Sequence, residues 1–197
     1  MNLPNKLTIF RILLVPVLCL VWLFPYESFG FHFGSVTVNF ISVSYLNIIV
    51  LVLFLIASFT DFLDGMIARK NNLVTTFGKF ADPIADKLLI NTVMIIMAYK
   101  RMIPVVPCLL MILRDIVVDG CRMIAAQNGV VVSAGILGKL KTVLQIITII
   151  ILLINNLPFE LLNIPVDEIM IWFTAFVSFA GGSSYFMQLK EYIFKSM

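Results

Sequence analysis

Long apolar runs alternate with short polar stretches along the whole chain of 197 residues. Most of the runs end at a proline or at charged residues, and breaks are expected at Pro104, Pro158, Pro165 and the Gly181–Gly182 pair. They cover residues 8–24, 45–60, 88–99, 105–118, 136–154 and 169–186. A helix needs roughly 20 apolar residues to cross a bilayer core about 30 Å thick. We therefore expect an all-α integral membrane protein with six transmembrane helices, packed as one bundle and one domain over residues 1–197.

The polar segments near the beginning of the chain help to define the first helix. Asn5, Lys6 and Leu7 precede the first run and predict a short N-terminal amphipathic segment. A cleaved signal peptide is the alternative, but no small-residue cleavage site follows the run and more apolar runs lie downstream. Residues 25–44 mix aromatic, glycine and polar residues and contain the only histidine, His32, which is typical of an external loop or an interfacial segment.

The composition supports a membrane environment. Hydrophobic residues make up 61% of the chain and charged residues 13%, whereas soluble domains are about 45–50% apolar. The three cysteines are scattered and lack CxxC spacing, so neither a zinc site nor a disulfide framework is indicated. We expect membrane lipids as partners and no nucleic acid.

The positions of the basic residues predict the orientation in the membrane. With a cytoplasmic N-terminus, twelve of the fourteen Lys and Arg residues lie inside, and only Lys100 and Arg101 lie outside. The inside set is Lys6, Arg11, Arg69, Lys70, Lys79, Lys87, Arg114, Arg122, Lys139, Lys141, Lys190 and Lys195. By the positive-inside rule both termini are cytoplasmic, and we expect a bacterial cytoplasmic membrane.

Two carboxylates end the second apolar run. On a continuing helix Asp61 and Asp64 share one face with the small residues Gly65 and Ala68, because these positions are three, four and seven residues beyond the first. A charged carboxylate at membrane depth costs a few kcal/mol unless it is paired, hydrated or bound to a metal. This face therefore combines costly negative charge with open space that could accept a flat ring.

A second helix face, leading into the third run, repeats the pattern. Gly78, Asp82 and Asp86 follow one another at intervals of four residues, after a polar stretch over residues 70–77 that predicts a turn. Four aspartates converging from two antiparallel helices repel one another, so divalent cations are the natural counter-charge. Oxygen ligands suit Mg²⁺ or Mn²⁺, and two such ions would support phosphoryl displacement.

A simpler interpretation assigns these aspartates to the wet end of the bundle. There they would cap helices and pair with Arg69, Lys79 and Lys87. Four aspartates at these intervals, with Gly or Ala at the intervening positions, favour the metal site.

The same stretch resembles the signature of the CDP-alcohol phosphotransferases. At every defined position it matches in the form Asp61-x2-Asp64-Gly65-x2-Ala68-Arg69-x8-Gly78-x3-Asp82-x3-Asp86. The six expected helices also agree with the fold of this family. The resemblance implies that the four aspartates bind two divalent ions and that Asp86 is also the general base.

Further roles are implied by the resemblance. CDP-diacylglycerol would be the donor, with Gly65, Ala68 and Gly78 accommodating its cytidine. Arg69 and Thr75 would hold the diphosphate, while Asn5 and Thr8 would meet the headgroup of the nucleotide lipid. A homodimer is also implied.

The acceptor is predicted from weaker features. The segments 2–11 and 77–87 are similar to the branch of the family that uses sn-glycerol 3-phosphate and forms phosphatidylglycerophosphate and CMP. The phosphate of such an acceptor needs cationic donors. Candidates cluster at the ends of the fourth and fifth runs: Arg114, Arg122, Ser133, Lys139 and Lys141. Asp115 and Asp119 are expected to orient the arginines.

Alternatives remain for both the acceptor and the class of protein. The same chemistry could use inositol phosphate, serine or phosphatidylglycerol. The basic residues could instead anchor helices at anionic headgroups. Because carboxylates inside membranes also mark ion pathways, a divalent-cation transporter is the alternative from another class. The motif contains no Ser, Cys or His nucleophile, which favours direct attack by the acceptor hydroxyl.

Overall fold

The computed structural model describes residues 2–71, 73, 75–127 and 135–195, with only the backbone of Arg69, Lys79 and residues 191–195. Its long helices are α1 (Leu3–Leu23), α2 (Tyr45–Lys70), α3 (Thr76–Tyr99), α4 (Val105–Gln127), α5 (Ile136–Leu153) and α7 (Val166–Lys195). Its short elements are the 3-10 helix η1 (Tyr26–Phe29), strands β1 (Ser35–Val38) and β2 (Ile41–Ser44), and helix α6 (Leu157–Glu160).

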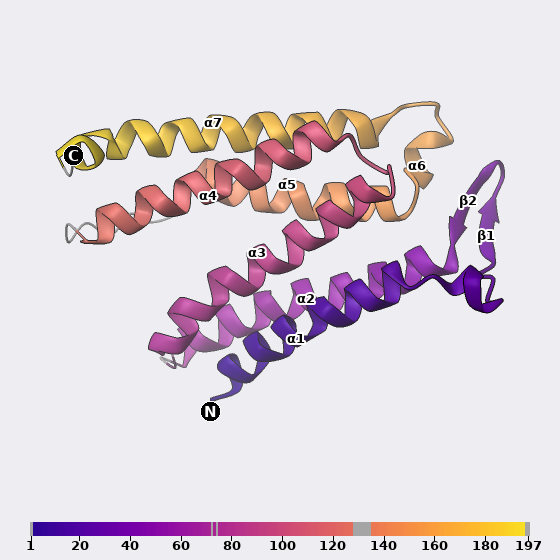
Figure 1. Cartoon of the computed structure of the whole chain (residues 1–197), viewed down its shortest axis with the longest axis horizontal. Helices are drawn as coiled ribbons and strands as arrows, with labels where there is room; N and C mark the ends of the chain where they lie inside the picture. Colours follow the sequence, from indigo (N-terminus) through magenta and orange to yellow (C-terminus); the bar gives the residue numbers. More distant parts are fainter. Residues whose placement is uncertain (1, 72, 74, 128–134, 196–197) are drawn as a thin grey trace.

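The long helices form two groups that share α3. Helix α1 packs against α2 and α3, whereas α7 packs against α4 and α5. Figure 1 shows α1 and α2 on one side, α4, α5 and α7 on the other, and α3 between them. Helix α3 also contacts α2, α4 and α5. Residues on successive turns of α3 can therefore face different parts of one site.

Polar side chains fix where these helices begin. The side chain of Asn2 accepts a hydrogen bond from the Asn5 amide at 3.1 Å and caps α1. Ser44 and Thr75 cap α2 and α3 in the same way, as expected for residues whose oxygens satisfy otherwise unpaired helical amides. Helix α1 therefore begins at Leu3, so the predicted N-terminal amphipathic segment is the first turn of α1 and not a separate element.

The segment between α1 and α2 contains an unpredicted hairpin. Strands β1 and β2 pair antiparallel, with Ser35 opposite Ser44 and Val38 opposite Ile41. The protein is all-α as predicted, but the segment expected as an external loop or interfacial segment contains this hairpin, because alternating Val, Thr and Ile residues favour extended structure. In Figure 1 the hairpin lies at one end of the molecule, and both termini lie toward the other end.

Four of the long helices, α1, α2, α5 and α7, are long and apolar enough to cross a membrane. Helices α3 and α4 do not meet the same criterion, because each carries charged residues within its length, such as Asp82 and Asp86 in α3 and Arg114 and Asp115 in α4. The structure thus supports a membrane protein with four candidate spans. Six spans remain a prediction.

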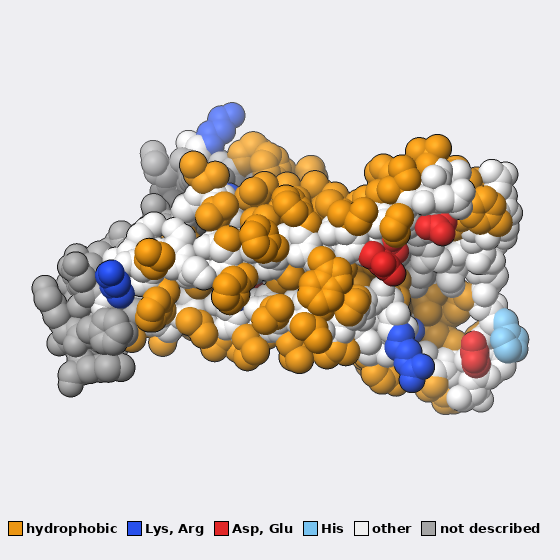
Figure 2. All heavy atoms as spheres, turned by 90° about the horizontal axis from the view of Figure 1, so that it is seen from above, with side chains coloured by type: hydrophobic (Ala, Val, Ile, Leu, Met, Phe, Trp, Pro, Cys, Tyr) orange, Lys and Arg blue, Asp and Glu red, His pale blue; other side chains and the backbone are white. Residues whose placement is uncertain are grey.

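Apolar side chains form the core of the bundle and also cover the outer surface around its middle. Leu18, Trp22, Phe54, Met97 and Met111 are fully or almost fully buried in the core. Figure 2 shows hydrophobic side chains across the middle of one face, with charged side chains toward the ends. A lipid-facing belt has this distribution.

The predicted break at Gly181 and Gly182 was wrong. Helix α7 continues through both residues to Lys195. Glycine inside a helix costs only about 1 kcal/mol relative to alanine, and packing of α7 against α4 and α5 can offset this. The pair instead permits a close contact with Arg114.

Candidate active site

A buried arginine on α1 joins the two aspartates of α2. The guanidinium of Arg11 is completely buried and forms ion pairs with Asp61 and Asp64. Asp64 is 3% exposed, whereas Asp61 is about 42% exposed. The first helix thus supplies a cation to the carboxylate face that the spacing on α2 predicts.

Thr8, one turn before Arg11, links this face to α3. Its hydroxyl donates to Asp82 Oδ1 at 2.7 Å and lies 3.5 Å from Asp64 Oδ2. Carboxylates from α2 and α3 therefore approach the same side chain. The predicted convergence of the two helix faces is confirmed for Asp64 and Asp82.

Three more predicted donor-site residues meet beside this point. Thr75 donates to Asn5 Oδ1 at 2.9 Å and accepts from the Gly78 amide at 3.0 Å. A methyl group at Gly78 would lie 3.3 Å from Asn5 Oδ1 and 3.6 Å from Asp82 Oδ2. The missing side chain of Gly78 therefore leaves space between Asn5 and Asp82 that any larger residue would fill. Gly65 and Ala68 lie on α2, partly exposed.

The oxygen donors at this junction suit a hard divalent cation. Carboxylates and a hydroxyl are the ligand types that Mg²⁺ and Mn²⁺ prefer, and one arginine cannot balance the charge of four aspartates. Across the described residues, however, no three Asp, Glu, His or Cys side chains converge as a ready-made metal site. The donor chemistry fits such ions, whereas the side chains are arranged around Arg11.

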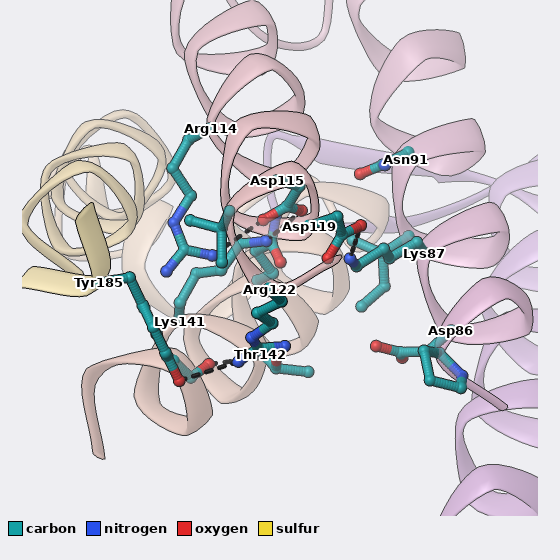
Figure 3. Close-up of a pocket in the computed structure, with 15 residues that line it drawn as sticks. Asp86, Lys87, Asn91, Arg114, Asp115, Asp119, Arg122, Lys141, Thr142 and Tyr185 are labelled. Atoms are coloured by element: carbon teal, nitrogen blue, oxygen red, sulfur yellow. Dashed lines mark hydrogen bonds and ion pairs between the residues drawn. The ribbon is translucent and has the colours of Figure 1, made fainter. Parts of the chain in front are cut away.

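A cavity of about 190 Å³ begins one turn further along α3, at Pro83 and Asp86. It is lined by residues of α3, α4, α5 and α7, among them Asp86, Arg114, Arg122, Lys141 and Tyr185. Figure 3 shows Asp86 at the edge of this group, with Arg114, Arg122 and Lys141 coming from the opposite helices. The last aspartate of the motif thus shares a cavity with three of the predicted acceptor residues.

One carboxylate organises two of the cations in the cavity. Asp115 is 5% exposed and pairs with Arg114, at 3.0 Å from Nη1, and with Lys141. This confirms the predicted partnership of Asp115 with an arginine. The group keeps one net positive charge, and Nε and Nη2 of Arg114 have no hydrogen-bond partner among the described residues. These donors are suited to an anion.

The other two cations of the cavity have different partners. Asp119 pairs with Lys87, so the prediction that it orients an arginine was wrong. Arg122 instead donates from Nη2 to the hydroxyl of Tyr185 at 2.8 Å. Among the described residues no carboxylate pairs with Arg122, and its charge is therefore not cancelled by an ion pair.

Three predicted site residues are not placed in this geometry. Lys139 is exposed and does not line the cavity. Ser133 lies outside the described residues, as does the side chain of Arg69.

Residues 1–180 match the model of the CDP-alcohol phosphatidyltransferase family. The chain belongs to this family. It is 42% identical to a CDP-diacylglycerol–glycerol-3-phosphate 3-phosphatidyltransferase of Bacillus subtilis, over 94% of this chain and 93% of the relative. It is 40% identical to an enzyme of the same name from Rickettsia felis, over 97% of each chain. Because the family and both relatives are transferases, this chain is a transferase as well.

Two features of the transferase were missed from the sequence. Arg11 was predicted only as one of the cytoplasmic basic residues, although a charge inside an apolar run is itself a signal of a buried partner. Tyr185 carried no signal, because a tyrosine in an apolar helix is ordinarily a packing residue. Only the approach of α7 to α4 and α5 shows its position in the cavity.

Proposed function

We propose that this membrane protein transfers the phosphatidyl group of CDP-diacylglycerol to sn-glycerol 3-phosphate, giving phosphatidylglycerophosphate and CMP. The observation that carries the proposal is the shared cavity of Asp86, Arg114, Arg122 and Lys141. If the hydroxyl of the acceptor lies at Asp86, the phosphate of the same acceptor molecule lies near the basic residues of the cavity. The enzymes named for this reaction in Bacillus and Rickettsia support the same acceptor.

The donor would occupy the junction of α1, α2 and α3. Hydrogen bonds join Asn5, Thr75 and Gly78 there, Thr8 donates to Asp82, and Gly65 and Ala68 leave space on α2. Arg69 would add a cation for the diphosphate. Asp82 contacts Thr8 in this junction, and Asp86, one turn further along the same face of α3, lines the acceptor cavity.

Two divalent ions, Mg²⁺ or Mn²⁺, would be held by Asp61, Asp64, Asp82 and Asp86. When bound, they supply charge neutralisation at the phosphate oxygens and the leaving group. Arg11 supplies one further positive charge next to Asp61 and Asp64. Because the guanidinium is buried, its charge stays in the same place during substrate binding and product release.

The protein's own residues would carry the proton transfer and the orientation. Asp86 takes the proton of the acceptor hydroxyl as that oxygen bonds to the β-phosphorus of the donor, and the bond from phosphorus to the CMP oxygen breaks. Arg114, Arg122 and Lys141 hold the acceptor phosphate away from the reacting phosphorus. No covalent intermediate on the enzyme is required.

We further propose six spans, with the site and both termini on the cytoplasmic side of a bacterial membrane. Arg122 lies in the second half of α4 and Lys141 in the first half of α5, the halves that are far from the hairpin (Figure 1). One catalytic domain over residues 1–197 and a homodimer complete the proposal.

The test of the function is a product assay with purified protein in lipid micelles. CDP-diacylglycerol is supplied with labelled glycerol 3-phosphate, inositol phosphate, serine or phosphatidylglycerol, and both CMP and the labelled lipid are measured. We expect CMP release and labelled lipid with glycerol 3-phosphate alone. Transfer to another acceptor would overturn the acceptor, and divalent-ion flux without CMP release would indicate a transporter.

A further inference from the structure

One face of α7 shapes the acceptor cavity without contributing a charge. Gly181, Gly182 and Tyr185 share this face, because they are spaced three and four residues apart. A methyl group at Gly182 would lie 2.7 Å from Cγ and 3.1 Å from Nε of Arg114. The glycines thus admit the side chain of Arg114, and Tyr185 lies one turn further along.

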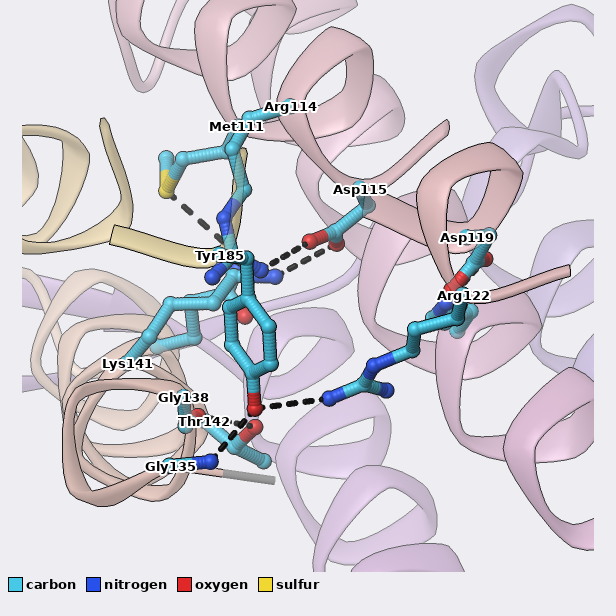
Figure 4. Close-up of polar contacts among 12 residues, drawn as sticks. Met111, Arg114, Asp115, Asp119, Arg122, Gly135, Gly138, Lys141, Thr142 and Tyr185 are labelled. Carbon is cyan, nitrogen blue, oxygen red and sulfur yellow. Dashed lines mark hydrogen bonds and ion pairs between the residues drawn. The ribbon is translucent and has the colours of Figure 1, made fainter. Parts of the chain in front are cut away.

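Tyr185 connects three helices at the cavity. It is 4% exposed, and its hydroxyl oxygen accepts from Arg122 Nη2 at 2.8 Å and from the amide of Gly135, which precedes α5. The Arg122 guanidinium carbon lies 4.8 Å from the centre of the Tyr185 ring, and that of Arg114 lies 6.0 Å away. Figure 4 shows the ring between Lys141 and Arg122, with the hydroxyl directed at Arg122 and Gly135.

The partner of Arg122 determines what the arginine can do. A carboxylate would orient the guanidinium but would also cancel its charge, as Asp119 does for Lys87. A hydroxyl and an aromatic face orient it and leave the charge available. An arginine that is ordered before substrate binds loses less side-chain entropy when it takes up an anion.

We propose that Tyr185 is a positioning residue that holds Arg122 ready for the acceptor phosphate. This inference rests on the proposed function, since it assumes an acceptor with a phosphate group. Tyr185 acts through Arg122 and does not take part in the chemistry. Its loss is therefore expected to weaken acceptor binding and to leave donor binding and turnover unchanged.

The test compares Tyr185→Phe with the wild-type enzyme in steady-state kinetics. Removing a hydrogen bond to a charged group is expected to raise KM for glycerol 3-phosphate about tenfold or more, with kcat and KM for CDP-diacylglycerol unchanged. Tyr99→Phe is the matched control, because Tyr99 is 77% exposed at the end of α3 far from the cavity. It is expected to behave as wild type.

A double-mutant cycle shows whether the effect passes through Arg122. In an Arg122→Leu background, Tyr185→Phe is expected to raise KM no further. An undiminished effect in that background would overturn the inference, and so would equal losses in kcat and in both KM values, which indicate a purely structural role. If wild type uses glycerol 3-phosphate and Tyr185→Phe matches it, only this inference fails; if wild type rejects that acceptor, the proposed function fails as well.

Discussion

The guanidinium of Arg11 on α1 forms an ion pair with the carboxylate of Asp64 on α2, and both side chains are buried. The same guanidinium reaches Asp61, one turn earlier on α2. The N-terminal helix is therefore part of the candidate active site, because it supplies the partner of both aspartates of α2. Because Asp64 also lies near Thr8 and Asp82, α1 aligns the carboxylates of two other helices.

Replacing Arg11 by methionine should destabilise the fold. Asp64 would keep its buried charge without its partner, which costs about 3–5 kcal/mol in comparable cases. We expect a lower denaturation midpoint in detergent without divalent ions, together with loss of activity. Lys6→Met, at an exposed position on the same helix, is the control and should match wild type. Equal stability of the two variants would show that Arg11 does not hold Asp64.

Asp86→Asn should stop turnover while the protein still binds its donor. The amide has nearly the same size as the carboxylate but cannot accept the proton of the acceptor hydroxyl. We expect CMP release to fall by at least about 10²-fold, with binding of CDP-diacylglycerol retained. Asp167→Asn, in the first turn of α7, carries the same change at the opposite end and should be fully active. Near-normal turnover of Asp86→Asn would refute its role as the base.

Chelation tests the metal proposal with two separate measurements. EDTA should abolish CMP release, and Mg²⁺ or Mn²⁺ should restore it. The ions should also raise the melting temperature of the purified protein without substrate, since a ligand at 100 times its Kd stabilises by about 2.7 kcal/mol. In a variant carrying both Asp64→Asn and Asp82→Asn, this stabilisation should disappear. An unchanged melting response would place the ions elsewhere.

Gly182→Ala should displace the side chain of Arg114, which packs against α7 at this glycine. The added methyl group would lie 2.7 Å from Arg114 Cγ, so the arginine must move and its contact with Asp115 should weaken. We expect a higher KM for glycerol 3-phosphate. Gly120→Ala on α4 is the matched control, because a methyl group there has no neighbour within 4 Å. It should be neutral or stabilising by up to about 1 kcal/mol.

Cysteine labelling tests the orientation in the membrane. In a background with Cys19, Cys108 and Cys121 replaced by alanine, a single cysteine is introduced as Lys6→Cys or Lys100→Cys. A membrane-impermeant maleimide applied to spheroplasts should label the second variant at once. The first should react only after permeabilisation, and the opposite pattern would reverse the proposed topology.

Much of the donor half of the site followed from local spacing. Asp61 and Asp64 share a face because a helix repeats every 3.6 residues, and the same period aligns Gly78 with Asp82. Thr75 caps α3 and thereby lies next to Gly78, while its role toward the donor stays a prediction. The hairpin was missed, since its short strands follow a mixed aromatic and polar segment that resembles a loop.

The acceptor half depended on contacts between distant segments. Basic residues on α4 and α5 could be predicted to cluster, but their partners could not. Asp119 pairs with Lys87 of α3 rather than with an arginine, because the packing of α3 beside α4 decides which charges meet. Tyr185 enters the cavity only because α7 returns against α4 and α5.

By itself the sequence determined the apolar helices, the carboxylate faces and the family, because each depends on residues that are close along the chain. The tertiary structure alone decided that Arg11 is the cation beside those carboxylates, that Asp86 faces the basic cavity, and that a tyrosine hydroxyl holds Arg122. The ion pair between Arg11 and Asp64, for example, joins residues that are more than fifty positions apart in the sequence. Helical periodicity fixes which face a residue occupies, but only helix packing fixes what that face meets.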